Sequence, residues 1–157
     1  MTTVLPSIPA MSTRKVIFQF NGDGIAASAK ADCKLYLIGA DKVIDENKVV
    51  LETADPVTEK YMNTFISQID GSLQYYAVAP QTGASKPGSA LFLSVHGAGV
   101  EAIGQARAYQ SKQWGNIVAP TNRRPRGFNW EDWGRLDALE VLSLPTINLN
   151  PIPGTFT

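Results

Sequence analysis

Cysteine and histidine are almost absent from this chain, which has one of each, Cys33 and His96, among its 157 residues. A single cysteine excludes a disulfide within the chain and a cysteine-rich metal site. A single histidine excludes a zinc site built from several histidines of this chain. We therefore expect these residues to hold no metal and no cofactor.

The chain also lacks an excess of charge and a long apolar run. Its 14 basic residues balance its 14 acidic residues. This balance produces no overall field that would attract nucleic acid or an anionic membrane, and we expect neither partner. No apolar run approaches the length needed to span a bilayer. With 44% hydrophobic and 18% charged residues, the composition is that of a globular protein with a buried core.

The first 15 residues are expected to form an irregular tail, because Pro6 and Pro9 interrupt them. They lack the basic stretch followed by a continuous apolar segment that is typical of a signal peptide. The sequence therefore leaves the localisation of the protein open.

A small β-rich segment is predicted for residues 16–56. Branched and aromatic residues predict strands at 16–20 and 34–38. Apolar residues at 43–44 and 49–51 flank the polar run Asp-Glu-Asn, which predicts a hairpin with its turn at 45–47.

Residues 57–78 allow two interpretations. Apolar residues recur every four positions, which is typical of a helix. However, Asp70-Gly71 lies between two runs compatible with strands, and an Asp-Gly pair in this setting is a strong hairpin signal. We prefer two strands, at 63–69 and 72–78.

From Ala90 onward the pattern alternates between strands and helices. A nearly continuous apolar run at 90–95 predicts a strand buried on both faces. A helix is predicted at 100–112, a short strand at 116–119, and a second helix at about 130–142 that Asn129 would cap. Strand–helix alternation favours an α/β fold with a partly parallel sheet and flanking helices.

The turn after the first of these strands reads His96-Gly97-Ala98-Gly99. Glycines allow the backbone to turn sharply and to approach a ligand closely. A backbone N–H group fixed at such a turn can stabilise the negative oxygen that develops during acyl transfer.

The ordered segments 91–106, 114–125 and 127–142, with 67–80 before them, resemble the prolyl-oligopeptidase-like and esterase-like branch of the α/β-hydrolases. The resemblance implies that residues 57–157 form the N-terminal part of an α/β-hydrolase domain. The fold class expected is thus a partial α/β-hydrolase sheet with flanking helices, preceded by the small β-rich segment.

The resemblance also assigns roles within the glycine loop. The backbone N–H of Ala98 corresponds to an oxyanion donor, and Gly97 and Gly99 shape the turn. We expect His96 to support the loop through structural hydrogen bonds, because it comes too early in the chain to be the catalytic base of this family.

The segment from 121 to 129 would lie at the rim of the substrate pocket. The candidate substrate-binding residues there and on the following helix are Asn122, Arg123, Arg124 and Trp130. The alternative for the arginines is a solvated loop in which one of them pairs with Glu131 or Asp132. Trp130 and Trp133 share a helix face, for which core packing is the default interpretation. Asp137, on the same helix, could bond a backbone group of the loop.

The sequence departs from this family at its central motif, because no Gly-x-Ser-x-Gly occurs in the chain. We therefore expect a truncated serine hydrolase that carries the oxyanion loop but no nucleophile and is inactive as this chain. The parent enzyme would act on a small ester or on a peptide- or glycan-linked substrate. The alternative is a non-catalytic binding or interaction module with a hydrolase-like scaffold.

Overall fold

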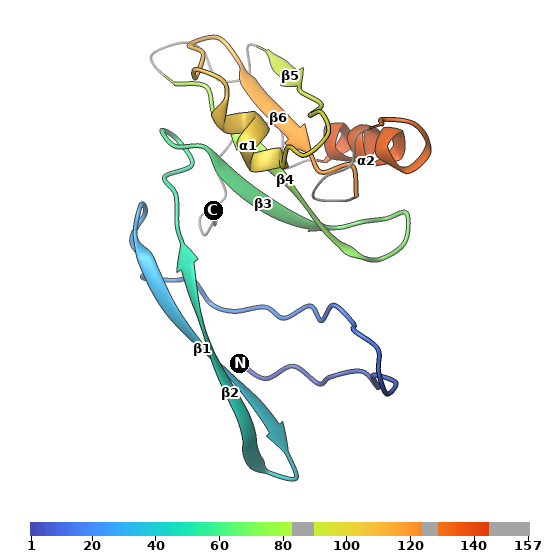
Figure 1. Ribbon diagram of the computed structural model, residues 1–157. Coiled ribbons are helices and arrows are strands. Elements are labelled where there is room, and N and C mark those ends of the chain that lie inside the picture. The colour runs from blue at the N-terminus through green and yellow to red at the C-terminus, as the bar shows by residue number, and fades with distance from the viewer. Residues whose placement is uncertain (83–89, 124–128, 145–157) are drawn as a thin grey trace.

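The computed structural model describes residues 1–82, 90–123 and 129–144 (Figure 1). These ranges contain two sheets and two helices. In chain order the elements are β1 (Lys30–Gly39), β2 (Lys42–Glu52), β3 (Tyr61–Ile66), β4 (Leu73–Ala79), β5 (Leu91–Leu93), α1 (Ala102–Arg107), β6 (Asn116–Pro120) and α2 (Asp132–Ser143).

Strands β1 and β2 form a sheet by themselves, an antiparallel hairpin paired from Lys30–Glu52 to Gly39–Lys42. Its two-residue turn is Ala40-Asp41, and both residues have positive φ angles, 48° and 60°. A two-residue turn of this kind matches the twist of the flanking strands. Figure 1 shows this hairpin extending away from the part of the molecule that holds the second sheet and both helices.

The second sheet has the strand order β3-β4-β6-β5. Strand β4 is antiparallel to both of its neighbours, whereas β5 and β6 are parallel. Parallel neighbours need a crossover connection, and α1 lies within it. The carboxyl ends of β5 and β6 therefore lie at the same edge of this sheet.

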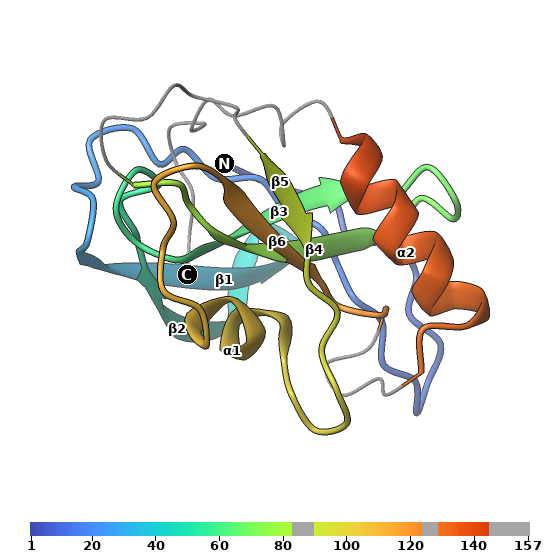
Figure 2. The ribbon, with the colours of Figure 1, turned by 90° about the horizontal axis from the view of Figure 1, so that it is seen from above.

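Each face of the second sheet packs against one helix (Figure 2). On one face, Ala102 and Ala106 of α1 lie against Ala77 and Ile117, where small side chains permit close approach. On the other face, Val141 of α2 lies with Tyr76, Val78 and Val118. Both clusters depend on β4 and β6, which are the two central strands.

The expected fold class is wrong. The described residues are 33% strand and only 14% helical, with two helices and two small sheets, which is not a helix-flanked α/β-hydrolase sheet. The physical reason is that the two longest strands, β1 and β2, form a separate hairpin without a helix layer. In addition, α1 has only six residues and β5 only three.

Several local predictions for residues 16–56 are also wrong. Residues 16–20 form no strand. Residues 42–52 form one continuous strand, so the predicted turn at 45–47 is wrong. The chain turns earlier, at Ala40 and Asp41, which both adopt left-handed conformations. Neither residue type is by itself a strong sequence signal for such a turn. The hairpin predicted around Asp70-Gly71 is confirmed by the antiparallel pairing of β3 with β4.

The second half shows a similar mixture. The strand predicted at 116–119 is confirmed as β6. Strand β5, expected to be buried on both faces, is exposed at all three residues, because it lies at the edge of its sheet. The predicted helix 100–112 is limited to α1. Helix α2 begins after Glu131, with no side-chain cap from Asn129.

Neither of the two helices in the described ranges has the length and apolar character that crossing a bilayer requires.

Candidate functional site

The two predicted site segments meet at one edge of the second sheet. The glycine loop 96–99 follows β5, and Thr121 follows β6, its parallel neighbour. In parallel sheets, ligand sites lie beyond the carboxyl ends of the strands. The His96 ring joins the two segments, since its Nε2 lies 3.3 Å from the carbonyl oxygen of Thr121.

His96 is buried, with 2% of its surface exposed. Its other ring nitrogen, Nδ1, lies 3.1 Å from the carbonyl oxygen of Gly97. Both nitrogens therefore face backbone carbonyl groups, to which the protonated one donates. This arrangement fixes the first residue of the loop against the end of β6.

Trp130 holds the same loop from another direction. Its indole Nε1 donates to the carbonyl oxygen of His96 over 2.9 Å, and its ring meets the His96 ring edge-on at 5.1 Å between centroids. The indole N–H of this predicted substrate-binding residue is thus used within the protein. Its ring remains half-buried beside the loop.

The middle of the loop is exposed, in contrast to its anchored start. Gly97, Ala98 and Gly99 are all exposed, and Gly99 has a φ of 75°, in the region that favours glycine. The N–H of Val100 closes the turn by donating to Gly97 O at 3.3 Å. Among the described residues, the N–H of Ala98 has no acceptor. It is a free backbone donor on a fixed loop.

Asn122 and Arg123 follow β6 in left-handed conformations, each with a φ of 58°. Asn122 is buried, and its side-chain amide donates to the carbonyl oxygen of Asn129. It therefore links the two ends of the segment that precedes α2. Arg124, the third predicted residue of this group, lies outside the described residues.

The side chain of Arg123 is only 8% exposed and is surrounded by carboxylates. Its guanidinium lies 2.9 Å from Glu140 and 3.0 Å from Asp70, and its Nε lies 3.6 Å from Asp137. It also lies 5.7 Å from the centre of the Trp133 ring. Its partners are therefore not Glu131 or Asp132, and its charge is already balanced within the protein.

Sequence reasoning missed most of this ion-pair network. Ser67 donates to Glu140 over 2.8 Å and accepts from Arg123 over 2.7 Å, although it is far from both in sequence. No local pattern signals such long-range pairs. The half-exposed Trp133 also stacks near Arg123, so its predicted role in the core is wrong.

Asp137 is fully buried at the centre of this region. Burial raises the pKa of its carboxyl group, although the Arg123 guanidinium and the backbone N–H groups of Arg123, Asn122 and Thr121 act in the opposite direction. The expectation that Asp137 bonds the loop backbone stays a prediction. The Thr121 hydroxyl donates to Asp137 Oδ2 over 3.5 Å, and Oδ1 lies 3.6 Å from Arg123 Nε with no hydrogen-bond partner among the described residues.

No protein-family model, curated protein or solved structure matches this chain. The function must therefore be inferred from the residues and their geometry.

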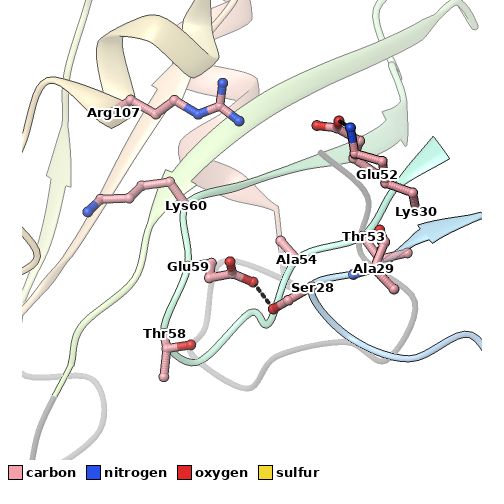
Figure 3. Close-up of a pocket in the computed structure, with 10 residues that line it drawn as sticks. All are labelled: Ser28, Ala29, Lys30, Glu52, Thr53, Ala54, Thr58, Glu59, Lys60 and Arg107. Carbon is pink, nitrogen blue, oxygen red and sulfur yellow. Dashed lines mark hydrogen bonds and ion pairs between the residues drawn. The ribbon is translucent and has the colours of Figure 1, made fainter. Parts of the chain in front are cut away.

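A pocket of about 450 Å³ lies elsewhere, where the base of the hairpin meets the segment before β3 and helix α1 (Figure 3). None of the predicted site residues lines it. Glu59 accepts hydrogen bonds there from Ser28 Oγ and from the N–H of Asp55, and these lower its pKa. Glu52 pairs with Lys30 at 3.0 Å. The Ser28–Glu59 contact links the base of the hairpin to the segment before β3, whereas the Lys30–Glu52 pair lies within the hairpin.

Across residues 1–82, 90–123 and 129–144, no three His, Cys, Asp or Glu side chains gather as a metal site.

Proposed function

We propose that this chain carries the oxyanion-binding part of a serine-hydrolase-type site, as its resemblance to that family implies. The observation that supports the proposal best is the exposed N–H of Ala98, which has no acceptor among the described residues. The buried His96 and the half-buried Trp130 hold the loop that presents it. The parent reaction would be acyl transfer from an ester or a peptide bond.

A fixed donor is useful in this chemistry because negative charge develops on the carbonyl oxygen only as the nucleophile attacks. A donor that is already in position stabilises this charge without reorganisation. Removing one such donor typically lowers the rate of the reaction by a factor of about 10²–10³. Neither His96 nor Trp130 has to touch the substrate in this arrangement; both position the loop.

The 157 residues contain no Gly-x-Ser-x-Gly, and the ring of His96 is engaged with two backbone carbonyls. In serine hydrolases the second oxyanion donor is the N–H of the residue after the nucleophile. The proposal therefore assigns one donor to this chain and no nucleophile. By itself the chain would bind an oxyanion weakly and would not form an acyl-enzyme.

The test is an NMR titration of the ¹⁵N-labelled chain with phenylphosphonate, whose anionic oxygens imitate the developing oxyanion. We expect the largest shifts at the amides of Gly97, Ala98 and Gly99. Ala98→Pro removes the donor and should abolish the response at the two glycines, whereas the matched variant Ala98→Ser keeps the N–H and should retain it.

Two results would contradict the proposal. One is a titration in which the loop amides do not respond, which would favour the competing binding module with its function in the front strands. The other is stoichiometric labelling of the chain by a fluorophosphonate probe, which would demonstrate a reactive serine.

A further inference from the structure

The outer edge of β2 has no partner strand in the part of the chain that the structure describes. The hairpin forms its own sheet, so β2 is paired with β1 on one side only. All residues of β2 from Lys42 to Val50 are exposed, and Val43 and Ile44 reach 59% and 64%. Apolar residues thus flank the polar centre of this strand, Asp45 to Lys48. An exposed, unpaired strand edge is a template for pairing with another strand.

Two backbone N–H groups at this edge donate to the side chain of the residue that precedes them. The N–H of Glu46 donates to Asp45 Oδ1 over 2.9 Å, and the N–H of Lys48 donates to Asn47 Oδ1 over 2.8 Å. Glu46 and Lys48 are alternate residues, as expected for N–H groups that point away from β1. A partner strand would replace these exposed side-chain acceptors with backbone carbonyl groups.

The charges on the same residues are incompletely paired. Lys48 lies directly opposite Lys34 of β1, an arrangement of like charges that is destabilising, and its only ion pair among the described residues is with Asp32 at 2.7 Å. Glu46 lies opposite Tyr36 and makes no ion pair with any described residue. One unpaired carboxylate and one crowded ammonium group thus lie two residues apart on one face of the strand.

We propose that β2 pairs antiparallel with β2 of a second copy of this chain, around a two-fold axis at Asn47. Asn47 then lies opposite Asn47, and Glu46 of each copy lies opposite Lys48 of the other. Farther out, Ile44 lies opposite Val50. The two hairpins join into one four-stranded sheet with an isologous interface.

Geometry favours this register over its neighbours. A two-fold axis perpendicular to the sheet keeps each side chain on the same face of the sheet in both copies. Because side chains alternate between faces along a strand, residues that lie opposite each other must be an even number of positions apart in sequence. Moving the axis by one residue opposes Glu46 to Glu46 or Lys48 to Lys48, and like charges directly opposite are destabilising. In the register at Asn47, Glu46 of one copy and Lys48 of the other form a hydrogen-bonded pair, in which the outward N–H of each donates to the carbonyl oxygen of the other.

The irregularity in the hairpin limits the length of this interface. Asp45 pairs with Leu37, whereas Val43 pairs with Ile38, so Ile44 is an extra residue in β2. Such a bulge bends the strand and ends regular pairing. We therefore expect the two copies to pair only from Ile44 to Val50. The dimer should be weak and should form at protein concentrations of roughly hundreds of micromolar.

The test exchanges charges in the full chain and measures mass by sedimentation equilibrium. Glu46→Lys alone places two lysine side chains opposite each other, and Lys48→Glu alone opposes two glutamates, so each variant should dimerise about tenfold more weakly or not at all. In an equimolar mixture of the two variants, one chain of each mixed pair carries two lysines and the other carries two glutamates. Both opposite-charge pairs are then restored, and the mixture should dimerise as the wild type does. The double variant E46K/K48E should also dimerise by itself.

All substituted positions are exposed, and the Lys48–Asp32 pair that is lost is a surface ion pair. The variants should therefore fold as the wild type does, and their circular dichroism spectra should match its spectrum. A wild-type chain that stays monomeric at hundreds of micromolar, single variants that dimerise as well as the wild type, or a mixture that stays monomeric would each overturn the proposal. The result is independent of the phosphonate titration, because the glycine loop and β2 belong to different sheets.

Discussion

Gly134 faces the side chain of Asn122, and this single contact decides what the position tolerates. A Cβ atom at Gly134 would lie 2.1 Å from Asn122 Oδ1 and 3.0 Å from the carbonyl oxygen of Asn129. Asn122 cannot move freely, because it is buried and its amide is bonded to that same carbonyl. The absence of a side chain at Gly134 therefore allows α2 to pack against the segment that precedes it.

Alanine normally stabilises a helix relative to glycine, and Gly134→Ala tests whether this contact reverses the preference. We expect the free energy of unfolding in urea to fall by about 1–3 kcal/mol, the usual cost of overpacking. Gly104→Ala in α1 is the matched control, since its Cβ would meet only Val100 Cγ1 at 3.8 Å. That variant should gain up to about 1 kcal/mol. Equal effects of the two substitutions would refute the role of Asn122.

At the scale of elements, the turn between β3 and β4 is tied to the segment after β6. Hydrogen bonds from the Ser72 side chain and backbone, followed by the Arg123 guanidinium, lower the pKa of Asp70 from 3.8 to about 2. A lowered pKa means that folding favours the ionised carboxylate. This contribution to stability is complete at pH values above 3.8, and it is lost as the pH falls from 3.8 to about 2.

Asp70→Asn should therefore destabilise the protein at neutral pH, and the difference from the wild type should shrink as the pH falls through that window. Urea unfolding followed by tryptophan fluorescence at a series of pH values measures this difference. Asp137, whose raised pKa has the opposite effect, is present in both proteins and largely cancels. A difference that does not vary with pH would show that the charge of Asp70 contributes nothing.

The elements also show which signals in the sequence were sufficient. Asp70-Gly71 and the apolar run of β6 identified their structures because the signal is local. The turn at Ala40-Asp41 carries no such residue pair, and the exposure of β5 depends on its position at a sheet edge. At the candidate site, the glycine loop was found from its motif. The carboxylates around Arg123 come from distant segments and could not have been found in this way.

At the scale of the whole molecule, stability should differ between the two sheets. Strands β4 and β6 are largely buried between α1 and α2, whereas β2 is exposed along nearly its whole length. At the base of the hairpin, Thr53 donates to carbonyl oxygens of Ala26 and Ala29, which precede β1. The contact between Ser28 and Glu59 links this base to the segment before β3. An isolated two-stranded hairpin is marginally stable in water, so we expect it to open locally without unfolding of the second sheet.

Native-state hydrogen exchange followed by mass spectrometry tests this difference. At low micromolar concentration, peptides from residues 30–52 should exchange faster than peptides from residues 73–79 and 116–120. If β2 pairs with a second copy, raising the concentration should slow exchange in β2 while leaving β4 and β6 unchanged. Equal protection of both sheets at low concentration would contradict the local opening. If the protection of the hairpin from exchange does not depend on protein concentration, contacts within one chain stabilise it instead.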